Sequence, residues 1–178
     1  MSRRTIFVAC FAGALAIWLG AARTAATRPQ TQNSYLSPEE ASKLRDDQDP
    51  SDRIKIYIAI AEDRLQKFDY EINRTVPERD RSDVLNGLLH AYEDSMDDAD
   101  DEIDDARYKQ ADIKAALKIM DEKGKTCLAR LQKYSKNGKY LDDYSDTLQD
   151  AIDSTTNALS DVADAQKEML PAVVRRKQ

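Results

Sequence analysis

Cysteine and histidine are almost absent from this 178-residue chain, and each scarcity excludes a kind of site. Cys10 lies in an apolar N-terminal run, so Cys127 has no intrachain disulfide partner beyond that run. We interpret Cys127 as a small buried hydrophobe, with a disulfide-linked dimer as the alternative. The single histidine, His90, cannot supply the two Glu-x-x-His motifs of a di-iron bundle. We interpret it as a surface or seam-edge residue. No second histidine is present to act as the base of a catalytic triad.

Glycine and strand patterns are also scarce. Beyond residue 22 the only glycines are Gly87, Gly124 and Gly138, too few and too dispersed for a phosphate-binding loop. No segment alternates apolar and polar residues as a strand does. The formal net charge is −6, whereas nucleic-acid binding requires basic patches. We therefore predict neither an enzyme nor a nucleic-acid binder, and no catalytic residue, cofactor or firm metal site.

The N-terminus has the order of a secretory signal peptide. Arg3 and Arg4 precede the apolar run 6–22, and small residues continue to Ala26. We predict a signal peptide over residues 1–22, with cleavage as late as Ala26, and hence a periplasmic or secreted protein. At about 17 residues the run is close to the roughly 20 that a membrane-spanning helix needs. The alternative is an uncleaved anchor, and we expect membrane contact only in that case.

The rest of the chain divides into three parts. The polar residues 23–36 predict a flexible tether, 37–170 a single helical domain, and 171–178 a basic tail. Apolar residues within 37–170 recur at spacings of three and four, the pattern of helices that bury one face. We predict an all-α fold, an elongated antiparallel bundle of three to four long helices after a short N-terminal helix, with coiled-coil-like seams.

Capping and breaking residues mark the expected helix ends. They predict a short helix from Ser37-Pro38, a second helix from Asp49-Pro50 to Val76-Pro77, a third starting at Ser82-Asp83, a stop at Asn137-Gly138 and a last helix from about Leu141 to Met169.

Residues 82–136 form either one long helix or two helices with a break near 107–112. An apolar seam runs through the whole segment, whereas typical helices are much shorter. Residues 82–108 hold ten acids and one arginine, a charge of −9, whereas 109–139 hold nine bases and three acids, a charge of +6. A turn would place these segments side by side and offset their charges; a continuous helix would place the charges at opposite ends.

The acidic run from Glu93 to Asp105 is the strongest functional signal, with nine acids and no base. Carboxylate oxygens are the ligands of Ca²⁺, so the candidate metal ligands are Glu93, Asp97, Asp98, Asp100, Asp101 and Asp104. The apolar seam continues through the run and no EF-hand loop is present, which favours a solvated helix face. We predict a non-catalytic structural or protein-interaction role, through this acidic face and with an unidentified protein partner. The alternative is a low-affinity divalent-cation binder.

The segment 36–55, LSPEEASKLRDDQDPSDRIK, resembles the opening of a group of uncharacterised exported bacterial helical proteins. The resemblance covers residues 36–55 only and is carried by helix-start residues. It implies a bacterial, exported, all-helical protein and assigns no functional residue.

Overall fold

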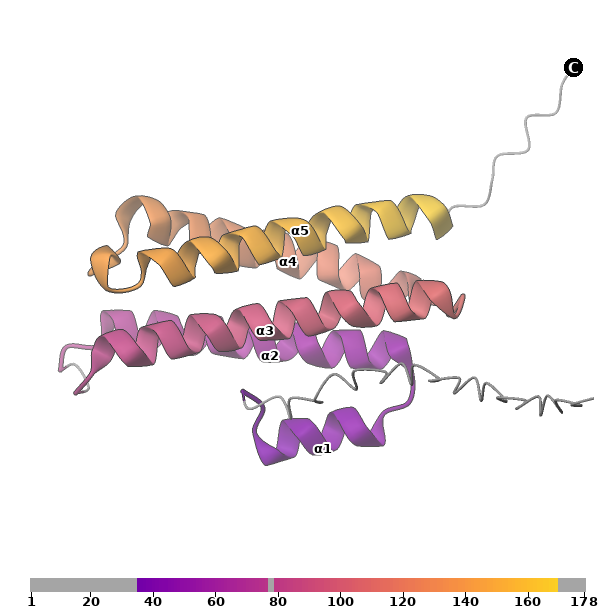
Figure 1. The fold of residues 1–178 in the computed structure, drawn as a ribbon, viewed down its shortest axis with the longest axis horizontal. Helices are drawn as coiled ribbons and strands as arrows, with labels where there is room; N and C mark the ends of the chain where they lie inside the picture. The colour runs from indigo at the N-terminus through magenta and orange to yellow at the C-terminus, as the bar shows by residue number, and fades with distance from the viewer. Residues whose placement is uncertain (1–34, 77–78, 170–178) are drawn as a thin grey trace, which may run out of the picture. The chain divides into compact units, whose positions relative to one another are not determined.

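The computed structural model describes residues 35–76 and 79–169, which form helices and their connections without a strand. The helices are α1 (Pro38–Asp46), α2 (Pro50–Asn73), α3 (Arg81–Tyr108), α4 (Lys114–Asn137) and α5 (Ser145–Met169), with a short 3₁₀ turn at Leu141–Asp143 (Figure 1). The prediction of three to four long helices after a short one is confirmed, with four long helices present. No helix in the described ranges is long and apolar enough to cross a membrane. The predicted signal peptide and basic tail, and the tether up to residue 34, lie outside them.

The first two helices begin as their capping residues predict. The Glu40 amide donates to Ser37 Oγ at 3.2 Å, and the Ser37 amide donates to the Glu40 carboxylate at 2.7 Å. This reciprocal pair is a capping box, which satisfies two backbone donors that a helix start leaves free. The Asp49 side chain accepts from the Ser51 amide at 2.8 Å to cap α2. Short polar side chains therefore set both helix starts.

The open question about residues 82–136 is resolved as two helices. Gln110 takes a left-handed backbone conformation, with φ of 56°. The Ala111 amide donates to the Ala106 carbonyl at 2.9 Å, and the Gln110 amide donates to the Arg107 carbonyl at 3.0 Å. These two bonds form a Schellman motif, which usually has glycine at the left-handed position. A helix end without glycine explains why the break was not evident in the sequence.

The last helix begins later than predicted. Tyr140 has a left-handed backbone with φ of 57°, and Leu141–Asp143 form one 3₁₀ turn before α5 begins at Ser145. The predicted start at Leu141 is therefore wrong by one turn. The Tyr144 hydroxyl donates to the Lys139 carbonyl at 3.0 Å and holds this corner closed.

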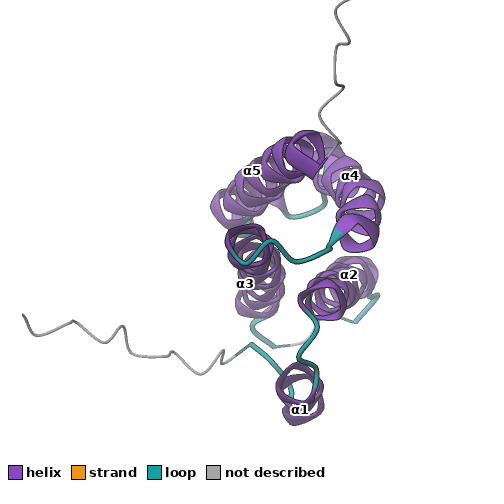
Figure 2. Ribbon diagram, turned by 90° about the vertical axis from the view of Figure 1, so that its right-hand side faces the viewer, coloured by secondary structure: helices purple, strands orange, loops and turns teal. Residues whose placement is uncertain are grey.

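The four long helices occupy the corners of a square, in the order α2, α3, α5, α4 (Figure 2). The sequential neighbours α2–α3 and α4–α5 are antiparallel hairpins. The hairpins lie beside each other, so that α2 runs parallel to α4 and α3 runs parallel to α5. Contacts across both parallel pairs join residues 61 positions apart, as in Glu62–Lys123 and Asn86–Thr147. The two hairpins are therefore in the same register along their length.

The predicted apolar seams meet in the centre of this square. On α2 the buried seam is Ile54, Ile58, Ala61, Leu65, Phe68 and Ile72, and on α3 it is Leu85, Leu89, Tyr92, Met96, Ala99, Ile103 and Ala106. Burying a large apolar side chain contributes about 1.5–3 kcal/mol, so these rows supply the main driving force for folding. Phe68 also meets Tyr134 and Tyr144 edge to face, each with ring centroids 5.2 Å apart. Gln110 is exposed because it lies in the turn that ends α3.

The placement of α4 corrects one expectation about charge. Although the chain turns between Tyr108 and Lys114, α3 and α4 do not lie side by side; they lie at diagonal corners of the square (Figure 2). The connection crosses one end of the bundle instead of forming a hairpin. The acidic helix α3 therefore packs against α2 and α5, and its charge is not offset by the basic helix α4.

Candidate functional site

The acidic run lies on α3, but its side chains do not form one uniform solvated face. Five carboxylates are exposed: Asp94, Asp97, Asp101, Asp104 and Asp105. The other four, Glu93, Asp98, Asp100 and Glu102, are partly buried. The interpretation as a solvated face holds for the first set and not for the second. Helical periodicity places these four beside the seam, where they face α1, α2 or α5.

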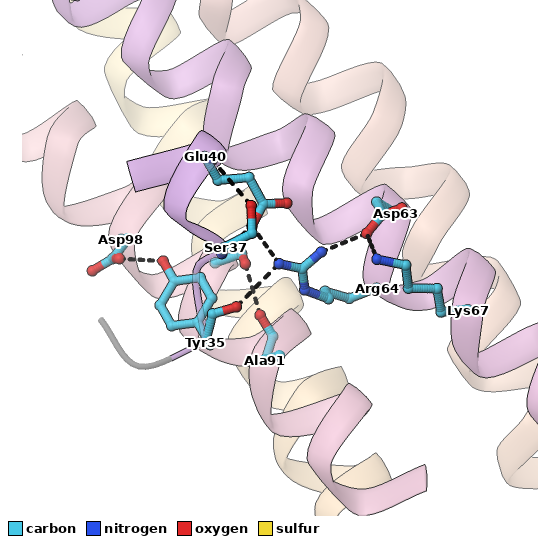
Figure 3. A network of polar contacts seen from close by, with 9 residues as sticks. Tyr35, Ser37, Glu40, Asp63, Arg64, Lys67, Ala91 and Asp98 are labelled. Atoms are coloured by element: carbon cyan, nitrogen blue, oxygen red, sulfur yellow. Dashed lines mark hydrogen bonds and ion pairs between the residues drawn. The ribbon is translucent and has the colours of Figure 1, made fainter. Parts of the chain in front are cut away.

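Two of the partly buried carboxylates fasten α1 to the hairpin. The Tyr35 hydroxyl donates a hydrogen bond to Asp98 (Figure 3). Burial raises the pKa of Asp98 above its ordinary value, although the bond from Tyr35 acts in the opposite direction. At the other end of α1, Arg53 donates to Glu102 at 2.8 Å and to the Leu44 carbonyl at 2.8 Å. The α3 acids therefore serve partly as attachment points for the N-terminal segment.

Arg64 is the centre of the contact between α1 and α2. Its side chain is only 8% exposed and donates to the Glu40 carboxylate at 2.6 Å and the Tyr35 carbonyl at 3.0 Å. It also pairs with Asp63, which binds Lys67 at 2.7 Å (Figure 3). Burial would raise the pKa of Glu40, but the hydrogen bonds from Arg64 and Ser37 and the Arg64 charge together hold this pKa below its ordinary value. Glu40 is therefore both a helix cap and an ion-pair partner.

Tyr35 and Leu36, which we assigned to the tether, pack against the hydrophobic core. The packed domain thus includes two residues before the first capping residue, Ser37. Sequence patterns gave no sign of this contact, because its partner Asp98 follows 63 residues later.

Asp100 is the most unusual member of the acidic run. It faces Asp161 of α5, and burial followed by this like-charged neighbour raises the pKa of Asp100 to about 7. Its Oδ1 atom is buried and has no hydrogen-bond partner among the described residues. The 61-residue register between these helices places the two carboxyl groups opposite each other across the α3–α5 interface.

Charge is divided between the two parallel helix pairs. Helices α3 and α5 together hold sixteen acids and three bases, a net charge of −13. Helices α2 and α4 together hold seven acids and eleven bases, a net charge of +4. We call the outer surface of α3 and α5 the acidic face. Its exposed acids on α5 are Asp146, Asp150, Asp153, Asp164 and Glu168.

The ligand arrangement of a metal centre is not found among these acids. Within residues 35–76 and 79–169, no three carboxylate, histidine or cysteine side chains converge as metal ligands would. His90 is exposed and lies 3.4 Å from the Glu93 carboxylate. Cys127 is buried, and this burial raises the pKa of its thiol. A surface depression at the α3–α4 connection is lined by Arg107, Gln110, Ala111, Asp112, Lys114 and Glu168.

Comparison with known proteins adds no assignment to these residues. The chain matches no family model, no curated protein and no solved structure.

Proposed function

We propose that this is a non-catalytic exported protein that binds a basic protein partner through its acidic face. The separation of charge between the helix pairs carries the proposal. The excess of thirteen negative charges on α3 and α5 would be costly to maintain without a use, since like charges repel. A basic partner surface would relieve this repulsion and would be steered towards the face from a distance.

Because the apolar seams are buried within the bundle, we expect the partner to be recognised by charge and not through an apolar groove. The four long helices bury these seams against one another, and α1 packs against α2. Among the described residues, the exposed large apolar side chains are Tyr70, Val76, Tyr108 and Tyr140, each at or near an end of a long helix. The middle of the acidic face therefore presents carboxylates to a partner. The predicted leader at residues 1–22 supports export.

Site-specific photo-crosslinking in intact cells tests the proposal. A crosslinking residue would replace Asp101 on the acidic face or, as the matched control, the exposed Lys125 on α4. We expect one reproducible adduct from position 101, in the envelope fraction, and none from position 125. Replacing Asp94, Asp97 and Asp104 by Asn should reduce that adduct. Equal crosslinking from both positions, or an adduct insensitive to these replacements, would contradict the proposal.

The divalent-cation alternative has a separate test. Calorimetric titration with Ca²⁺ and Mg²⁺ would show saturable heat, lost on replacing Asp97, Asp98, Asp100 and Asp101 by Asn, if the acidic run bound a cation. No contact among the described residues favours this alternative over a protein partner.

A further inference from the structure

The proposed binding role of the acidic face does not account for two facing carboxyl groups at the α3–α5 interface, those of Asp100 and Asp161. Asp100 follows the buried Ala99, and Asp161 precedes the buried Val162, so both side chains lie at the edge of the core. The 61-residue register that joins Asn86 to Thr147 and Arg107 to Glu168 places Asp100 opposite Asp161. In the described ranges, Asp100 Oδ1 is one of two buried side-chain atoms without a hydrogen-bond partner.

The groups around this pair are mostly acidic. Asp101 and Asp104 lie near Asp100 on its own helix. Arg107, the basic residue of the last turn of α3, is engaged by Asp104 at 2.8 Å and by Glu168 of α5 at 2.9 Å.

Other nearby bases are engaged elsewhere. On α5, Lys167 binds Asp164 at 2.8 Å. From α2, Arg53 binds Glu102. No described base is thus paired with Asp100 or Asp161.

An ionised carboxylate accepts hydrogen bonds and cannot donate one. Two ionised carboxylates in contact therefore repel each other and leave their facing oxygens without donors. One proton removes both penalties, because a protonated carboxyl donates to its ionised neighbour. The pKa of about 7 that burial and Asp161 give Asp100 is consistent with such a proton near neutral pH.

We propose that Asp100 and Asp161 share one proton and form an acid-dependent latch between α3 and α5. The proton joins two helices that are distant in sequence and that belong to different hairpins. The latch closes as the pH falls below neutrality and opens as it rises. It is independent of the proposed partner binding.

The sign of the effect follows from proton counting. In the unfolded chain Asp100 loses its proton near its ordinary pKa of 3.8, whereas the folded pair keeps a proton up to about pH 7. Between these values the folded state binds more protons than the unfolded state, so stability decreases as pH rises. The contribution is full below about pH 4 and is lost above about pH 7.

Thermal unfolding of the full chain at pH 5 and pH 8 tests the latch. All variants would carry His90→Gln, so that no histidine contributes to the pH difference. We expect Tm to be higher at pH 5 than at pH 8 by about 4 °C or more. Asp100→Asn should raise Tm at pH 8 and reduce the pH difference, because its amide donates to Asp161 at any pH. The matched control, the exposed Asp101→Asn, should retain most of the difference.

Carboxyl ¹³C chemical shifts of the unsubstituted chain provide a second measurement that does not depend on a variant folding. We expect one carboxyl titration with a midpoint near neutrality that involves both Asp100 and Asp161. Midpoints below pH 5 for both residues would overturn the proposal. So would an Asp100→Asn variant with the full pH difference, or an Asp101→Asn variant that loses it equally.

Discussion

The hydroxyl of Tyr92 on α3 lies 2.8 Å from the hydroxyl of Thr155 on α5, and both side chains are fully buried. Thr155 donates its own proton to the Ala151 carbonyl at 2.6 Å. The Tyr92 hydroxyl must therefore donate to Thr155 Oγ1. This two-bond chain fixes how the two parallel helices meet in the core.

Removing the Tyr92 hydroxyl and removing the Thr155 hydroxyl should lower the free energy of unfolding by different amounts. Tyr92→Phe leaves Thr155 bonded to Ala151, so we expect a loss of about 0.5–1.5 kcal/mol in the free energy of unfolding. Thr155→Val leaves the buried Tyr92 hydroxyl without its acceptor, at a cost of about 1–3 kcal/mol. Urea unfolding of both variants measures the difference. A larger loss for Tyr92→Phe would contradict the assigned direction of the bond.

The buried Arg64 should control the docking of α1. Arg64→Met removes the partner of Glu40, and breaking a buried ion pair costs about 3 kcal/mol. We expect faster amide hydrogen exchange across α1, with α4 and α5 unchanged. The control is Lys67→Met, since Lys67 also pairs with Asp63 but is exposed. Unchanged exchange in α1 of Arg64→Met would show that apolar contacts alone hold this helix.

Substitution by glycine should have opposite effects on stability at two glutamines, Gln110 at the end of α3 and Gln132 inside α4. Gln110→Gly should stabilise the chain by about 1 kcal/mol, because a left-handed conformation costs a non-glycine residue about that much. Gln132→Gly, at an exposed position inside α4, should destabilise it by about 1 kcal/mol. Thermal or urea unfolding compares the two. A destabilised Gln110→Gly variant would contradict the Schellman assignment.

Local rules predicted the parts of this fold that depend on neighbouring residues. The capping box at Ser37 and Glu40 and the seam of α2 follow from spacings of three and four residues, which a sequence displays directly. The end of α3 did not follow, because Gln110 stands where such a turn usually has glycine. A residue with no strong preference gives no signal, and only the packing of both helices decides its conformation.

The candidate site was predictable in composition and not in arrangement. The run from Glu93 to Asp105 indicated an acidic helix, and its exposed members lie as expected. That Asp98 binds Tyr35 and that Asp100 meets Asp161 depends on which helices become neighbours. The diagonal placement of α4 decides this, and neither charge nor periodicity within one helix specifies it.

The side-by-side hairpins also constrain the order in which the chain can assemble. Contacts between α2 and α4, and between α3 and α5, can form only after residues 61 positions downstream have been synthesised. At synthesis rates of about 5–20 residues per second, this delay is about 3–12 seconds. During that interval the first hairpin exists without the surface that covers its apolar side. That exposed apolar side makes the half-made chain prone to aggregation until the second hairpin arrives.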